Sequence, residues 1–195
     1  MLTQTFPVKP ILGLSFMAAG IATLCDVNHV YTGALSYTYP QFMGQAWWVF
    51  FNFWQAFFMM ICVYYILTGS LAKKKWITLS VSKDVMAPFI DAILFFIVAY
   101  LLTGFAQNSP LLLSGILYGT YLVRLASSYE KLFILGFGLA MAMGGIFVEG
   151  SLSALGQMQY AHPAIYNVPL WLGGLYLHGS FALRSGARAF LPPRL

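Results

Sequence analysis

The chain has 195 residues, of which 60% are hydrophobic and only 8% are charged. A composition this apolar excludes a soluble globular domain, and the length suits one membrane-embedded domain over residues 1–195. The net charge of +5 would suggest a nucleic-acid partner for a soluble protein. In a membrane protein basic residues instead border lipid and meet anionic headgroups, so we expect no nucleic-acid binding.

Six apolar spans follow one another along the chain. They cover about residues 10–31, 45–67, 85–106, 110–125, 132–155 and 170–189. The first is longer than the apolar region of a cleavable signal peptide, so we expect it to remain as a spanning helix. The turn from Gln107 to Pro110 is so short that the third and fourth spans must form an antiparallel hairpin.

The fifth span is rich in glycine, which permits close approach of neighbouring backbones. We therefore expect it at the centre of the bundle. A three-plus-three arrangement of the spans would form an inverted repeat, but we find no internal sequence similarity that supports one.

All ten Lys and Arg residues fall on one side of the membrane when six spans are drawn, and the three opposite connections carry none. The basic residues are Lys9, Lys73, Lys74, Lys75, Lys83, Arg124, Lys131, Arg184, Arg188 and Arg194. Cytoplasmic loops collect Lys and Arg. The sequence therefore predicts an all-α integral membrane protein, a bundle of six transmembrane helices with both termini in the cytoplasm.

Ionisable residues at membrane depth are expensive to bury, and they suggest function by default. Asp26 and His29 lie three apart on one face of the first span, and Glu149 lies at comparable depth on the fifth. These three could form one polar cluster near the outer leaflet. Such a cluster could bind a headgroup or accept a proton, or it could hold the two spans together by hydrogen bonds. Both interpretations stay open.

Other polar residues have simpler interpretations. Asp91 lies within reach of Arg124 or Arg184, and an ion pair that anchors helix ends is expected there. His178 lies near the middle of the sixth span, where we expect a neighbouring carbonyl or hydroxyl to satisfy its ring. Cys25 lies toward the outer leaflet and the second cysteine toward the inner, so no disulfide can join them.

Catalytic and metal-binding patterns are missing from the sequence. The histidine, carboxylate and cysteine residues have no recognisable metal-ligand spacing, and no H-E-x-x-H or paired C-x-x-C pattern occurs. Walker and Rossmann glycine patterns are absent too. We therefore expect no enzyme activity, no cofactor and no metal site.

Aromatic side chains surround the second span, while the glycine-rich fifth span leaves little side-chain volume. Between them we expect an apolar space that lipid chains fill, with polar residues toward its outer end. A phosphate would lack a basic partner at that depth, so a neutral two-chain lipid is favoured. The predicted lipid-binding residues are Asp26, His29, Asn52, Phe53, Trp54, Gln55, Phe57, Gly145 and Glu149.

Several segments resemble the Insig (insulin-induced gene) family. They are Ala46-Trp47-Trp48-Val49, Phe105-Ala106-Gln107-Asn108, and Gln159-Tyr160-Ala161-His162-Pro163 followed by Trp171-Leu172 and Gly179. The resemblance implies a six-helix bundle with cytoplasmic ends and a lipid-lined cavity, which accommodates an oxysterol in animal members. Those members are non-catalytic regulators that bind the sterol-sensing domains of Scap and of the sterol-synthesis reductase.

The chain also departs from the animal pattern. Gly104 stands where animal members have an acidic residue implicated in binding Scap, and Ser109-Pro110 replaces a Gln in the following turn. With these differences, the chain resembles a prokaryotic relative of the family. We expect a non-enzymatic protein of the bacterial inner membrane, or of the endoplasmic reticulum if eukaryotic, that binds a diacylglycerol-like or sterol-like lipid. The alternatives are a small ion- or proton-coupled transporter using Asp26, His29 and Glu149, or an accessory subunit with a membrane-protein partner. A homo-oligomer is compatible with each.

Overall fold

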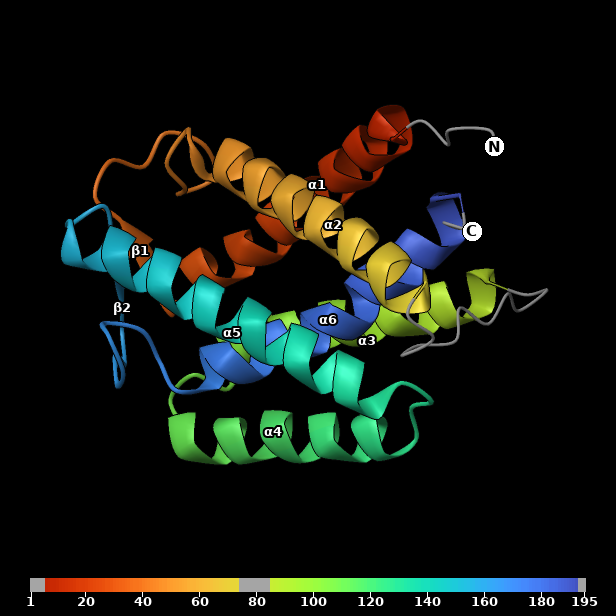
Figure 1. Ribbon diagram of the computed structural model, residues 1–195. Coiled ribbons are helices and arrows are strands. Elements are labelled where there is room, and N and C mark those ends of the chain that lie inside the picture. The colour runs from red at the N-terminus through yellow and green to blue at the C-terminus, as the bar shows by residue number, and fades with distance from the viewer. Residues whose placement is uncertain (1–5, 74–84, 193–195) are drawn as a thin grey trace.

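The computed structural model describes residues 6–73 and 85–192, which form a bundle of six helices with one short two-stranded sheet at one end (Figure 1). The elements are α1 (Val8–Tyr31), β1 (Leu35–Tyr37), α2 (Val49–Lys73), α3 (Met86–Phe105), α4 (Pro110–Ala126), α5 (Lys131–Ala154), β2 (Met158–Tyr160) and α6 (Trp171–Phe190). Of the basic residues that orient the spans, Lys74, Lys75, Lys83 and Arg194 lie outside the described residues.

Each predicted span corresponds to one helix, but the helices differ in character. Four of them, α1, α2, α3 and α5, are long and apolar enough to cross a membrane, with mean hydropathy between 1.6 and 2.1. The apolar helix α4 is shorter, at 17 residues. The helix α6 has 20 residues, includes Arg184 and Arg188, and is buried along most of its length. A helix covered by protein needs less apolar surface than one that faces lipid.

The connections divide between the two ends of the bundle. The start of α1, the end of α6 and the link from α4 to α5 lie at one end, while the sheet and the turn from α3 to α4 lie at the other (Figure 1). Six helices that run alternately up and down the bundle produce this arrangement. The connections at each end are the same ones that the charge distribution grouped together. The predicted assignment of the basic end to the cytoplasm follows from the positive-inside rule alone.

That orientation can be measured with single cysteines in a cysteine-free background. Cysteines at Ser36, Asn108 and Ala161 should react with an impermeant thiol reagent in intact cells, because their connections carry no basic residues. A cysteine at Ser128 should react only after permeabilisation. Labelling of Ser128 in intact cells, with the other three protected, would reverse the topology.

The centre of the bundle is α6, which packs against all five other helices, and not α5 as the sequence predicted. A Cβ atom added to Gly173 would lie 2.6 Å from the Tyr118 hydroxyl, and one added to Gly174 would lie 2.8 Å from Leu117. On α5 a Cβ at Gly145 would also lie 2.2 Å from a neighbour, the Tyr176 ring, but one at Gly136 or Gly144 would meet nothing within 4 Å. Glycine content does not distinguish close packing from open space, which explains the wrong prediction.

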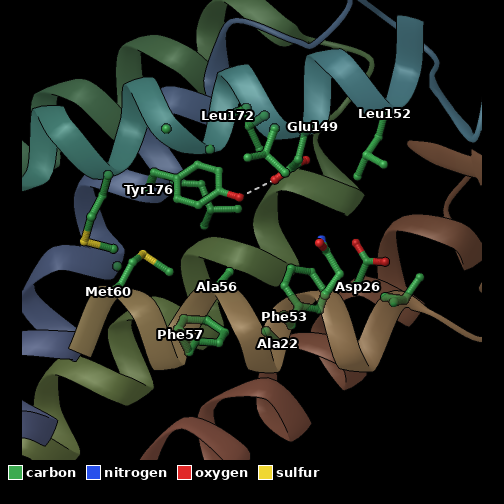
Figure 2. A pocket seen from close by; sticks show the side chains of 18 of the residues that line it. Ala22, Asp26, Phe53, Ala56, Phe57, Met60, Glu149, Leu152, Leu172 and Tyr176 are labelled. Carbon is green, nitrogen blue, oxygen red and sulfur yellow. Dashed lines mark hydrogen bonds between the residues drawn. The ribbon is translucent and has the colours of Figure 1, made fainter. Parts of the chain in front are cut away.

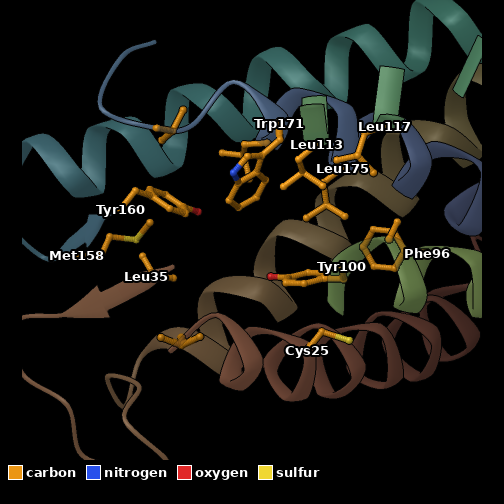
Figure 3. Close-up of a cluster of buried hydrophobic side chains, with 14 of the residues drawn as sticks. Cys25, Leu35, Phe96, Tyr100, Leu113, Leu117, Met158, Tyr160, Trp171 and Leu175 are labelled. Carbon is orange, nitrogen blue, oxygen red and sulfur yellow. The ribbon is translucent and has the colours of Figure 1, made fainter. Parts of the chain in front are cut away.

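The main core lies at the sheet end, where α1, α3, α4, α6 and both strands meet (Figure 3). Trp171 at the start of α6 is 1% exposed there. In the sheet, which the sequence did not predict, β1 and β2 are antiparallel with Ser36 opposite Gln159. The sheet thus joins the segment after α1 to the segment after α5. Both cysteines are free, as predicted.

Candidate functional site

A cavity of about 290 Å³ lies between α2 and α5. Residues of α1, α3 and α6 and of both strands complete its walls. Figure 2 shows side chains of α2 and α5 facing one another across this space. Met59, Ala140, Gly144 and Val148 line the cavity and are also exposed, so it opens between α2 and α5 toward the surface of the bundle. This space is called the α2/α5 cleft below.

Most of the lining is apolar. Phe53, Phe57 and Met60 project from α2, while Met141 and Leu152 project from α5. Polar residues join them at the end of the cleft nearest the sheet, where Asp26 and Glu149 contribute to the lining (Figure 2). Asn52, in the first turn of α2, also lines the cleft. An apolar pocket with a few polar groups at one place is typical of a small-molecule site and matches the shape of an amphiphile.

Asp26 on α1 is 2% exposed and accepts several hydrogen bonds. Its Oδ2 atom accepts from the Tyr37 hydroxyl at 2.6 Å and from the Gln45 amide at 2.9 Å. Its Oδ1 atom accepts from the Tyr100 hydroxyl at 3.3 Å. Burial, together with the Asp26 carboxylate, holds the pKa of Tyr37 above its ordinary value. The Tyr37 hydroxyl therefore keeps its proton and remains a donor.

Glu149 on α5 has its own partners. One carboxylate oxygen accepts a hydrogen bond from the Tyr176 hydroxyl (Figure 2). The other accepts one from the Tyr160 hydroxyl. No hydrogen bond or ion pair joins Asp26 to Glu149 in the described part of the chain. The possible single cluster is therefore divided into two carboxylate sites on one cleft. Among the described residues no hydrogen bond joins these side chains of α1 to Glu149, so the alternative in which they hold the two helices together is not supported.

His29 lies behind the cleft and links α1 to α3. Its Nε2 atom is 2.7 Å from the Thr103 hydroxyl, which donates its own proton to the Tyr100 carbonyl at 2.6 Å. Because that proton is already used, Nε2 must be the donor to Thr103. The other ring nitrogen lies 3.4 Å from Asp26 Oδ1. His29 is not among the cleft residues, so its contacts indicate a packing role.

Some of the remaining predicted lipid-binding residues line the cleft and others do not. Asn52, Phe53, Phe57 and Gly145 line the cleft, whereas Trp54 and Gln55 do not. The Trp54 indole donates to Ser15 at 3.1 Å, and Gln55 is exposed. Asn52 and Gln55 are three apart, but the cleft covers only a narrow stripe of α2. Among the described residues, no hydrogen bond involves the Asn52 side chain, so its amide is available to a ligand.

Sequence reasoning missed the phenols that bind the two carboxylates. None of Tyr37, Tyr100, Tyr160 and Tyr176 was predicted to donate a hydrogen bond to a carboxylate. A signal was present, because the acidic residue and its strand tyrosine are 11 residues apart in both Asp26–Tyr37 and Glu149–Tyr160.

Charged groups outside the cleft behave mostly as expected. Asp91 pairs with Arg124 at 3.6 Å, one of its two predicted partners. Arg184 pairs instead with Glu130 at 3.3 Å, which the sequence did not indicate. The ring of His178 is satisfied as predicted, by the Leu117 carbonyl at 3.0 Å and by Thr120.

A double-mutant comparison can test the division into two carboxylate sites. Asp26→Asn and Tyr37→Phe share one hydrogen bond, so their stability losses should couple by about 0.5 kcal/mol or more. Asp26→Asn and Glu149→Gln share no hydrogen-bond partner, so their losses should add within about 0.5 kcal/mol. Equilibrium unfolding in mixed detergent micelles measures both quantities. Strong coupling between the two acids would contradict the division.

The chain matches no protein-family model and no curated protein. Among solved structures, it is similar to MvINS, a mycobacterial Insig homologue from Mycobacterium vanbaalenii. The TM-score is 0.75 at 17% sequence identity, covering 98% of this chain and 100% of that one. A cross-linked trimer of a variant of MvINS gives the same values. The chain therefore has the fold of an Insig homologue, which confirms the six-helix architecture implied by the sequence resemblance.

Proposed function

We propose that this chain is a non-enzymatic membrane protein that holds a neutral lipid in the α2/α5 cleft. The proposal rests on one observation. A cavity of about 290 Å³ opens on the side of the bundle, and it has apolar walls and polar groups at one end. A lipid fits this pattern, because its chains can lie along the walls while its head meets the polar end. The cleft opens where a lipid could enter sideways from the bilayer.

The polar end favours an uncharged head. Asp26 and Glu149 supply carboxylates, and no Lys or Arg of the described residues lines the cleft. A phosphate placed there would be desolvated without a cationic partner, which is costly. A hydroxyl can donate to a carboxylate oxygen, and an ester carbonyl can accept from the Asn52 amide. A diacylglycerol-like lipid offers both groups, and a sterol-like lipid offers the hydroxyl.

The alternative functions have less support. A transporter using Asp26, His29 and Glu149 would need a polar route to the opposite end of the bundle. Phe57, Met60 and Met141 line the cleft in that direction. An accessory subunit would need a partner surface. The trimer of the MvINS variant makes self-association worth measuring here. We place the protein in a bacterial inner membrane, or in the endoplasmic reticulum if the source is eukaryotic.

Mass spectrometry of lipids retained after detergent purification tests the proposal. The wild-type protein should carry on the order of one neutral lipid per chain. Gly144→Leu should abolish retention, because Gly144 lines the cleft and an added Cβ there meets nothing within 4 Å. Its side chain can therefore enter the cleft without displacing neighbours.

Gly136→Leu is the matched control, because Gly136 lies on the same helix, is equally open and does not line the cleft. This variant should retain lipid at the wild-type level. A wild type without stoichiometric lipid, or equal retention by both variants, would refute the lipid assignment.

A further inference from the structure

The chain contains an internal repeat at a spacing of 123 residues, the separation between Ser36 and Gln159, which face one another in the sheet. Shifting the sequence by this amount aligns residues that define the cleft and its loops. The aligned pairs are Asp26 with Glu149, Gly33 with Gly156, Tyr37 with Tyr160, Pro40 with Pro163, and Trp48 with Trp171. The first pair supplies the two carboxylates of the cleft.

The backbone repeats at the same spacing. Gly33 and Gly156 have φ angles of 75° and 69°, in the left-handed region that favours glycine. Each strand is followed by a tight loop closed by one isolated β-bridge, Phe42 with Gln45 in the first copy and Ile165 with Val168 in the second. The aligned residues therefore occupy equivalent positions in two similar backbones.

Side-chain contacts repeat as well. The Tyr37 hydroxyl donates to Asp26, and that of Tyr160 donates to Glu149. The rings of Tyr37 and Trp48 are 5.7 Å apart at 77°, and those of Tyr160 and Trp171 are 6.0 Å apart at 84°. The chain thus holds two copies of one helix–strand–helix unit, α1–β1–α2 and α5–β2–α6. Both units run in the same direction (Figure 1), unlike the inverted repeat considered from sequence.

The repeat relates the α2/α5 cleft to the interface between α6 and α1. A second, smaller cavity of about 50 Å³ lies at that interface. Six residues of α1 and α6 that line it are repeat counterparts of residues that line the cleft. They are Met17, Ala18, Ile21, Gly179, Ala182 and Leu183, which correspond to Ala140, Met141, Gly144, Ala56, Met59 and Met60. The two cavities are therefore equivalent sites in the two units.

A transmembrane helix covers the second site. Phe89, Ile93 and Phe96 of α3 line the small cavity, and Tyr100 follows at the same helical spacing. The Tyr100 hydroxyl donates to Asp26 at 3.3 Å. One face of α3 thus presents apolar side chains to the groove between α1 and α6. At the end of that groove, the same face presents the Tyr100 hydroxyl to the Asp26 carboxylate. The α2/α5 cleft is the same groove without such a helix, and its carboxylate is Glu149.

We propose that the α2/α5 cleft is a docking groove for one transmembrane helix of another membrane protein. The fitting helix has bulky apolar residues at positions i, i+4 and i+7 and a hydroxyl side chain at i+11 that reaches Glu149. Helix docking and lipid binding then exclude one another, so lipid occupancy controls access to the partner. The exclusion rests on the proposed lipid function, whereas the docking itself does not.

The α3 segment itself supplies a defined probe, a synthetic peptide of residues 86–105 carrying Ile93→Cys. The native α3 stays in place, because Asn28 donates to the Leu101 carbonyl at 3.0 Å and His29 binds Thr103. The full-length protein is placed in nanodiscs, lacks its native cysteines and carries Gly144→Cys. Gly144 is the repeat counterpart of Ile21, which lines the second cavity together with Ile93. Disulfide formation should occur at this site and not in the matched Gly136→Cys protein. A Tyr100→Phe peptide should bind roughly three- to twentyfold more weakly, from the lost hydrogen bond.

Retained lipid, measured in the same samples, separates the two proposals. Cross-linking at Gly144→Cys with loss of lipid supports both docking and exclusion. Retained lipid with no cross-linking overturns helix docking and leaves lipid binding intact. Cross-linking without lipid in any sample supports docking and refutes the lipid function. Equal cross-linking at both cysteines overturns docking, since it indicates non-specific association with α5.

Discussion

Replacing Glu130 with Gln is expected to lower the free energy of unfolding by about 3 to 5 kcal/mol. The Glu130 side chain is 9% exposed and accepts hydrogen bonds from Arg188 at 2.6 Å on both carboxylate oxygens. It also pairs with Arg184 at 3.3 Å. Neutralising the acid leaves two largely buried guanidinium groups without a counter-charge, and unpaired buried charge is strongly destabilising. Equilibrium unfolding in mixed detergent micelles measures the loss.

Asp91→Asn is the matched control for Glu130→Gln. It also removes one carboxylate from an arginine, but Asp91 is 78% exposed and lies 3.6 Å from Arg124. Water screens the exposed Asp91 carboxylate, so its attraction to Arg124 should contribute at most about 1 kcal/mol. Equal losses in the two variants would show that burial of the Glu130 network does not determine its contribution.

The sequence predicts the helices well because lipid imposes long apolar spans and basic residues mark one set of their ends. The predicted fifth span over residues 132–155 corresponds to α5 (Lys131–Ala154). The second span was placed less accurately, because Gln45 to Trp48 are apolar enough for a helix. In the structure Gln45 instead binds Asp26 from the loop before α2, which begins at Val49.

Orientation around each helix was harder to predict. In a membrane both the lipid-facing and protein-facing sides are apolar, so the hydrophobic periodicity that orients a helix in a soluble protein is weak. Asn52 and Gln55 therefore seemed equivalent, yet only Asn52 faces the cleft. Glu130 was assigned to a connecting loop, and its burial depends on Arg184 and Arg188, which are distant in sequence. Such contacts between distant residues have no local sequence signal.

Gly145→Leu is expected to destabilise the fold by about 1 to 3 kcal/mol or more, the usual cost of overpacking a core. Sequence reasoning would use this substitution to fill the cleft without unfolding, since Gly145 lies on its wall. In the structure a Cβ atom at Gly145 would lie 2.2 Å from the Tyr176 ring. The ring must move, and its hydroxyl then loses the hydrogen bond to Glu149. Thermal unfolding of purified variants measures the effect.

The adjacent Gly144→Leu separates steric strain from simple filling of the cleft. Gly144 and Gly145 both line the cleft, but only Gly145 is in contact with Tyr176. Gly144→Leu should therefore unfold close to the wild-type temperature, while Gly145→Leu should unfold well below it. Adding Tyr176→Ala to Gly145→Leu should recover part of that loss relative to Tyr176→Ala alone, because the clashing ring is gone. If Gly145→Leu were as stable as Gly144→Leu, Tyr176 would have to move freely, and the hydroxyl that binds Glu149 would not be fixed in place.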